Sequence, residues 1–214
     1  MTTRDTFESL RHASAEELSK KLANGASVDL AQFAGYEYRG LNCHVPGTFG
    51  RYARQFTKVF VVDDNTGRYH GWNLKIQQDP DLRHWRPDAS SQHRPGDWSD
   101  PIATAFWWLG GLRGRDPVLG RFGVYPAGPD DRYAPNPKAI VIDYCKGPTP
   151  LGDVTYFLRD YVVALREGDP DLLVGCAFAD FGLFARQLPG YFVLEKAGPI
   201  HRTGAARMHP VTRG

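Results

Sequence analysis

The sequence has little of what marks secreted, membrane-spanning or metal-binding proteins. Its three cysteines, Cys43, Cys145 and Cys176, are odd in number and are not spaced like metal ligands, which favours a reducing compartment. The N-terminus lacks the apolar segment of a secretory signal. The longest apolar stretch, 102–112, is far shorter than the roughly 20 residues of a membrane-spanning helix. We therefore expect a soluble, cytoplasmic protein without a membrane span.

Neither sign of charge is in excess, and no catalytic signature is present. The formal net charge is +2, and even the densest basic patch, Arg113, Arg115 and Arg121, has no pattern typical of nucleic-acid recognition. The glycine-rich segment 110–115 lacks the spacing of a phosphate-binding loop, and no histidines are spaced as in HExxH. We expect no nucleic-acid partner, no metal and no cofactor.

What the sequence does contain is a long series of short, alternating, aromatic-rich segments. Aromatic residues make up 13% of the 214 residues, and they suit both a half-buried sheet and the wall of a ligand cavity. We predict a mainly β fold in one domain, 1–214: an antiparallel barrel over 34–196, after a helical lead-in at 1–25 and before a loose tail at 198–214. The expected strands are 34–41, 56–63, 68–77, 121–125, 139–145, 156–165, 172–180 and 190–196.

Local signals support several of these elements. Ser14 and Glu17 form a capping-box pattern within a helix expected over 4–25. Asp64-Asn65-Thr66-Gly67 predicts a hairpin between two strands, because Asn and Gly tolerate positive φ. Segment 79–101 is rich in proline, which predicts a long irregular connection that serves as a lid or a docking surface. Segment 156–165 also fits a helical stripe, and an antiparallel α+β sheet is therefore the alternative fold.

Two residues are candidates for acid–base chemistry. Asp143 lies in an apolar strand, where an unpaired carboxylate is costly, so it must be paired, protonated or solvated. If it faces the barrel interior it is a candidate general acid or base; if it faces outward it is an ordinary surface carboxylate. His70 shares a strand face with Trp72 and could shuttle protons or orient a substrate.

Aromatic side chains are the candidates for ligand binding. Hydroxyl groups within an apolar wall are the usual composition of a small-molecule pocket. Which of them point inward depends on strand register, because a slip of one residue exchanges the two faces. The candidate ligand-binding residues are Tyr36, Tyr38, Trp72, Tyr144 and Tyr191.

The segment Gly35-Tyr36-Glu37-Tyr38-Arg39-Gly40 after a helix resembles the start of lipocalin-like (calycin) barrels. Tyr38-Arg39-Gly40 is similar to the Trp-x-Gly part of the Gly-x-Trp-x-Gly strand of small bacterial members, and Gly35 lies one residue earlier than the first glycine of that pattern. The resemblance implies an up-and-down barrel that binds an apolar ligand such as a lipid, a pigment or a haem-like group.

Three functions are compatible with these features. The leading hypothesis is that the protein binds a small apolar molecule inside the barrel. The alternative is a cofactor-independent isomerase, cyclase or hydratase that uses Asp143 with His70 or a tyrosine. The third is an interaction module that docks through 79–101. A homodimer is compatible with all three.

Overall fold

The computed structural model describes residues 5–45, 54–74, 76–86, 118–129, 131, 133–147, 154–181 and 185–200. Within these residues the chain forms three α-helices, two short 3-10 helices and nine strands. The α-helices are α1 (Phe7–Arg11), α2 (Ala15–Asn24) and α3 (Leu30–Phe33), and the 3-10 helices are η1 (Tyr144–Lys146) and η2 (Val154–Phe157). The strands are β1 (Tyr36–Cys43), β2 (Gln55–Val62), β3 (Tyr69–Leu74), β4 (Val118–Pro126), β5 (Ile140–Asp143), β6 (Leu158–Arg166), β7 (Asp169–Asp180), β8 (Ala185–Gln187) and β9 (Tyr191–Pro199).

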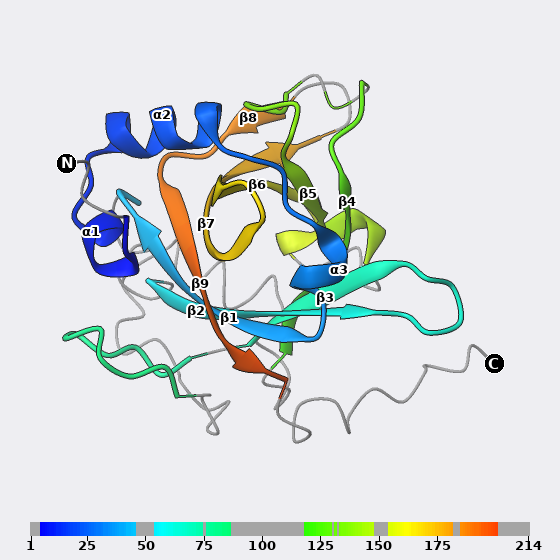
Figure 1. The fold of residues 1–214 in the computed structure, drawn as a ribbon, viewed down its shortest axis with the longest axis horizontal. Helices are drawn as coiled ribbons and strands as arrows, with labels where there is room; N and C mark the ends of the chain where they lie inside the picture. Colours follow the sequence, from blue (N-terminus) through cyan, green and yellow to red (C-terminus); the bar gives the residue numbers. More distant parts are fainter. Residues whose placement is uncertain are drawn as a thin grey trace.

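Eight of the strands close into an antiparallel barrel (Figure 1). The hydrogen-bonded order runs from β6 through β5, β4, β3, β2 and β1 to β9 and β7, and β7 pairs with β6 to complete the ring. The short strand β8 pairs with the C-terminal end of β7, from Phe178 to Asp180. The predicted mainly β barrel is confirmed, and it is consistent with the calycin-like architecture that the resemblance implied. The α+β alternative is wrong, because β6 is a strand paired on both sides.

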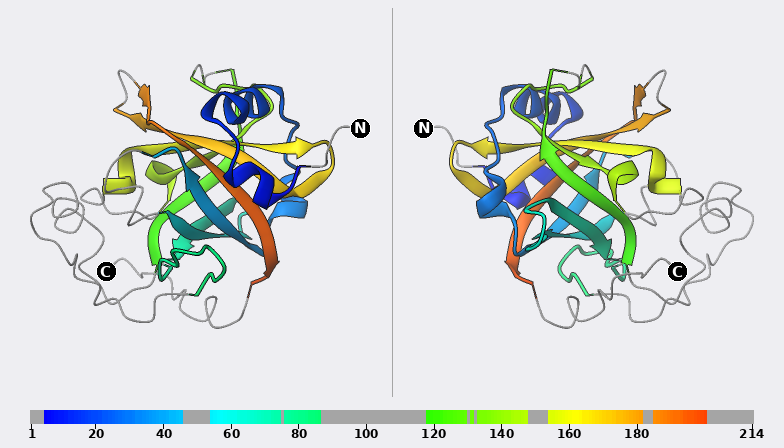
Figure 2. Two further views of the ribbon diagram at one scale, coloured as in Figure 1. Left: turned by 90° about the vertical axis from the view of Figure 1, so that its left-hand side faces the viewer. Right: turned by 90° about the vertical axis from the view of Figure 1, so that its right-hand side faces the viewer.

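The lead-in forms two helices that pack outside the barrel, where one helix over 4–25 was expected. Thr6 and Ser14 each cap a separate helix, so the chain turns between α1 and α2. Their buried side chains, among them Leu10 and Leu18, join an outer core formed with the outward faces of β1, β5, β6, β7 and β9 (Figure 2). Both faces of this part of the sheet are therefore buried.

The third helix closes one end of the barrel. Asp29 caps it, and the Phe33 ring packs inside against Tyr38 and Phe60, at centroid distances of 4.8 and 3.9 Å. Val28 joins the same inner core. We call this the α3 end, and the opposite end, from which the connections 44–54 and 75–117 leave, the loop end.

Aromatic rings lying over glycines fill the barrel interior. Phe56 is paired across the strands with Gly40, Phe122 with Gly71, and Phe192 with Gly175. A Cβ atom on each of these glycines would lie within 2.6 Å of the partner ring. The glycines thus make room for rings that cross the interior, a device also used to stabilise designed sheets.

Several element boundaries differ from the expectation. The predicted hairpin at Asp64–Gly67 is present, with Gly67 at a φ of 66°. Strand β9 extends to Pro199 because Gly198 and Pro199 pair with β1, whereas 198–214 was expected to be a tail. Strand β8 was not predicted. The segments 87–117 and 201–214 lie outside the described residues, and with them most of the expected excursion and the tail.

Candidate functional site

A buried ion pair spans the barrel interior. Lys58 on β2 and Asp160 on β6 lie four strands apart in the ring of eight, on opposite walls, and their Nζ and Oδ2 atoms are 3.1 Å apart. Their side chains are only 3% and 6% exposed. Each occupies an inward position between apolar neighbours, so the strand alternation aims both at the centre.

Two further side chains complete this polar cluster. Lys58 Nζ donates to Asn73 Oδ1 at 2.9 Å and to Tyr144 Oη at 2.6 Å. Tyr144 donates to Asp160 Oδ2 at 3.2 Å and accepts from Asn73 Nδ2 at 3.1 Å. The three N–H donors of Lys58 are thereby satisfied. We call these four residues the Lys58 cluster.

Aromatic faces surround the Lys58 amine. Its Nζ lies 5.0 to 5.8 Å from the ring centroids of four residues, within the range of cation–π attraction. Three of these rings are the ones that lie over glycines. The rings are those of Phe56, Phe122, Tyr144 and Phe192.

Burial perturbs both ionisable groups of the pair. Desolvation lowers the pKa of Lys58, and the attraction of Asp160 opposes this shift. Desolvation raises the pKa of Asp160, and Lys58 and Tyr144 oppose it by favouring the carboxylate. The two pKa values therefore move toward each other, so the cost of moving a proton from the amine to the carboxylate falls. Perturbed pairs of this kind are frequent at functional sites.

Packing of the interior changes along the barrel axis, with the Lys58 cluster at the transition. Toward the α3 end, inward-facing side chains such as Tyr38, Phe60 and Leu194 are at most 1% exposed. Toward the loop end, six inward-facing side chains are partly exposed, although Phe192 is buried. The six are Asn42, Phe56, Asn73, Leu158, Ala177 and Ala179.

Asp143 faces outward, on the other side of the barrel wall from the cluster. It is 1% exposed, and its Oδ2 accepts from Tyr125 Oη at 2.8 Å and pairs with Arg159 at 3.2 Å. Arg159 also contacts Asp180 at 3.0 Å, which ties β5 to β6 and β7. The carboxylate thus has the partner that its burial demands, and it is neither exposed to water nor turned inward.

The other predicted residues divide between the two faces. His70 and Trp72 share one face of β3, as expected, but that face is the outer one, and Tyr191 packs on the outer core. Tyr36, Tyr38 and Tyr144 face inward. Burial raises the pKa of Tyr38, whose hydroxyl has no hydrogen-bond partner in the part of the chain that the structure describes.

Sequence reasoning included Tyr144 but missed its three partners. The missed signal was one charge on the inward face of each of two apolar strands. Phe56, Lys58 and Phe60 alternate on β2, and Leu158, Asp160 and Val162 alternate on β6. Opposite charges in such positions must either pair with each other or remain hydrated.

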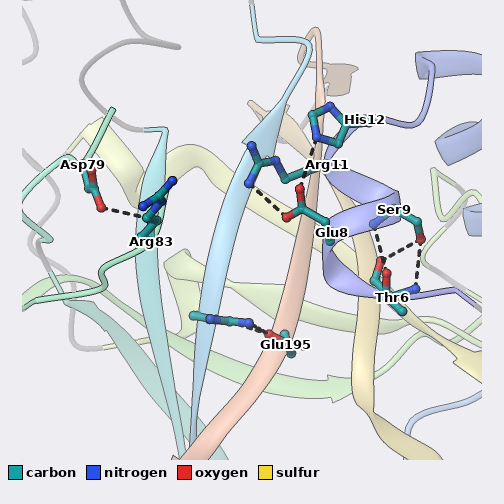
Figure 3. A network of polar contacts seen from close by, with 9 residues as sticks. Thr6, Glu8, Ser9, Arg11, His12, Asp79, Arg83 and Glu195 are labelled. Carbon is teal, nitrogen blue, oxygen red and sulfur yellow. Dashed lines mark hydrogen bonds and ion pairs between the residues drawn. The ribbon is translucent and has the colours of Figure 1, made fainter. Parts of the chain in front are cut away.

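A second polar region lies on the outer surface, beside α1 (Figure 3). Glu8 contacts Arg11 and His12 there, and Glu195 on β9 pairs with Arg39 on β1. Next to it, where β1 and β7 begin and β9 ends, lies a groove of about 460 Å³, which we call the outer groove. Its lining includes Tyr36, Asp171 and Lys196. Its charged groups are already paired with one another at the surface: Lys196 lies 3.6 Å from Asp171.

A scan of protein-family models, a search of curated proteins and a search of solved structures each found no match to the chain. Among the described residues no group of three or more His, Cys, Asp or Glu side chains is arranged to hold a metal ion. No helix in the described ranges is long and apolar enough to cross a membrane.

Proposed function

We propose that the protein binds a small, mainly apolar molecule in the loop end of the barrel. The observation that carries this proposal is a change of packing along the axis, from buried side chains such as Tyr38, Phe60 and Leu194 toward the α3 end to six partly exposed inward-facing side chains toward the loop end. Apolar walls with a few convergent polar groups are the usual composition of a small-molecule site. The lipocalin-like resemblance points the same way.

The charge of the cluster indicates which polar group such a ligand carries. Lys58 and Asp160 neutralise each other at 3.1 Å. A ligand carboxylate would meet the Asp160 charge, while a ligand ammonium would meet Lys58, and either charge would lose its hydration on entry. A neutral hydroxyl group can instead exchange hydrogen bonds with Asn73, Tyr144 and Asp160, and a carbonyl group can accept them from Asn73 and Tyr144. We therefore expect neutral ligands.

Competition binding tests the proposal. The neutral fluorescent probe N-phenylnaphthylamine is bound to the protein and displaced with decanol, methyl octyl ketone or decanoic acid. We expect displacement by the alcohol and the ketone at least about ten-fold more strongly than by the acid, at a pH where the acid is ionised. No saturable binding of any of these compounds would overturn the proposal.

A pair of variants locates the site. Leu158→Trp fills the loop end from its inward position on β6, whereas Leu172→Trp adds the same bulk outside, on β7 beside the outer groove. Probe binding should be lost in L158W and kept in L172W. The reverse result would place the ligand in the outer groove.

A cofactor-independent enzyme is the second candidate, and the position of Tyr144 favours it. Its hydroxyl contacts both Lys58 and Asp160, so it can donate a proton to a carbonyl oxygen while Asp160 accepts one from the neighbouring carbon. Exchange of these α-hydrogens in methyl octyl ketone, followed by NMR in deuterated water, is the test. Exchange above the buffer rate that is lost in Tyr144→Phe would support this candidate, and exchange at the buffer rate would exclude it for this ketone.

A further inference from the structure

The Lys58 amine has surroundings that differ from those of exposed lysines among the described residues. Lys20 is 69% exposed, and Lys138 and Lys146 are also exposed, whereas the Lys58 side chain lies inside the barrel and is 3% exposed. Exposed amines are protonated near neutral pH and are poor nucleophiles. An amine that is desolvated among aromatic rings, with a proton acceptor beside it, is the arrangement that activates a lysine toward carbonyl groups.

The partners of Lys58 match the requirements of imine formation. Asp160 Oδ2, at 3.1 Å, can take a proton from the ammonium group and leave a free amine. Tyr144 Oη, at 2.6 Å from Nζ and 3.2 Å from Asp160, can pass a proton between nitrogen, oxygen and carboxylate. Asn73 is partly exposed and lies one residue before the end of β3, so it is the partner that an entering carbonyl oxygen can replace.

We propose that the ligand is an aldehyde and that Lys58 binds it covalently as an imine, an inference that rests on the proposed function of the loop end. Asp160 first accepts a proton from the ammonium group, and the free Nζ lone pair then forms the C–N bond while the carbonyl electrons move to oxygen. Tyr144 relays the surplus proton on nitrogen to that oxygen, giving a carbinolamine. Asp160 returns its proton to the hydroxyl, water leaves, and the C=N bond forms. The product is an iminium ion paired with the Asp160 carboxylate, so the charge of the site is unchanged.

Reductive trapping tests this step. The protein is incubated with decanal and sodium cyanoborohydride, digested and mapped by mass spectrometry. A reduced adduct adds the mass of decanal and two hydrogens less one water. We expect the adduct at Lys58 to accumulate at least about ten-fold faster than at exposed Lys138, because the bound aldehyde is held beside the amine. The wild-type protein alone decides this comparison, whatever the folding of any variant.

Lys58→Arg and Lys138→Arg form the matched pair of variants. K138R should keep the fast phase of trapping and K58R should lose it, with circular dichroism confirming the fold of each. If decanal displaces N-phenylnaphthylamine as decanol does but is trapped only at surface lysines, the imine is excluded while the binding site stands. If neither compound displaces the probe, the proposed function fails, and the imine fails with it.

Discussion

Lys58 Nζ and Asp160 Oδ2 meet 3.1 Å apart after reaching inward from opposite walls of the barrel. Asn73 on β3 bonds to Lys58, and Tyr144 after β5 bonds to both members of the pair, so side chains from the two walls and from strands between them converge. A mainly apolar interior thereby contains one polar layer. That layer divides the filled α3 end from the partly exposed loop end.

Replacing one member of the ion pair should lower the free energy of unfolding more than replacing both members. Lys58→Met leaves Asp160 buried without its countercharge, so we expect a loss of about 3–5 kcal/mol in the free energy of unfolding. The double variant Lys58→Met with Asp160→Leu should recover most of that loss. Arg166→Met, at the exposed Arg166–Asp169 pair, is the control and should cost less than about 1 kcal/mol. Urea denaturation measures all three, and a double variant no more stable than Lys58→Met would contradict a coupled pair.

The stability of Asp160→Asn should depend on pH differently from that of the wild type. Desolvation lowers the pKa of Lys58 in the folded chain and Asp160 opposes this shift, so replacing Asp160 with asparagine lowers that pKa further. Between the lowered value and the ordinary value of 10.5, the unfolded variant binds more protons than the folded variant. The free energy of unfolding of D160N therefore rises with pH in that window. In the wild type, burial raises the pKa of Asp160, and that contribution to stability is lost as pH rises through the raised value.

Both effects reduce the difference in the free energy of unfolding between D160N and the wild type as pH increases; we call this difference the stability gap. Urea midpoints from about pH 7 to about pH 9 follow this gap, and other titrating groups cancel in the comparison. A gap that widens toward high pH would contradict the assignment of Lys58 as a buried amine.

Closure of the α3 end should depend on one ring. Phe33 is 1% exposed and its ring packs at a tilt against Tyr38 and Phe60, so Phe33→Ala should cost about 3–5 kcal/mol. Phe157→Ala is the matched control, because Phe157 is 41% exposed, and we expect it to cost less than about 1 kcal/mol. Equal losses in thermal or urea denaturation would show that α3 does not close the barrel.

Asp143→Asn should separate stability from ligand binding. The carboxylate accepts from Tyr125 and pairs with Arg159 outside the barrel, so its neutralisation should cost about 1.5–3 kcal/mol. Probe binding and any ketone exchange should be unchanged, because the Lys58 cluster lies on the other side of the wall. Loss of either activity in folded D143N would restore the acid–base role first expected for Asp143.

Thiol chemistry reports on the packing of the outer core. Burial raises the pKa of Cys43 to about 11 and that of Cys176 to about 12, while Cys145 is exposed. We expect an alkylating reagent to modify Cys145 in the native protein and the two buried thiols only on unfolding. Peptide mapping measures each site, and native-state labelling of Cys176 would contradict the packing of α1 and α2 against the barrel.

The sequence was informative where one face of a strand differs from the other. The predicted alternation of β3, with Tyr69, Gly71 and Asn73 opposite His70 and Trp72, is confirmed by its register with β2. The hairpin before it is also confirmed, since its turn residues carry a local signal. These features depend on neighbours in the chain.

Features that depend on distant contacts were not predictable in the same way. Helices α1 and α2 cover the outer face of several strands, so both faces are apolar and periodicity does not show which is inside. Tyr191 was for that reason grouped with inward-facing Tyr144. The partnership of Lys58 with Asp160 joins residues more than a hundred positions apart, and only closure of the barrel brings them together.

The most direct test of ligand binding at the loop end is a titration with decanol followed by methyl NMR of leucine and alanine side chains. We predict shifts for Leu158 and Ala177, which face inward at the loop end, and none for Leu172, which lines the outer groove. Shifts confined to Leu172, or no saturable shifts at all, would contradict a binding site above the Lys58 cluster.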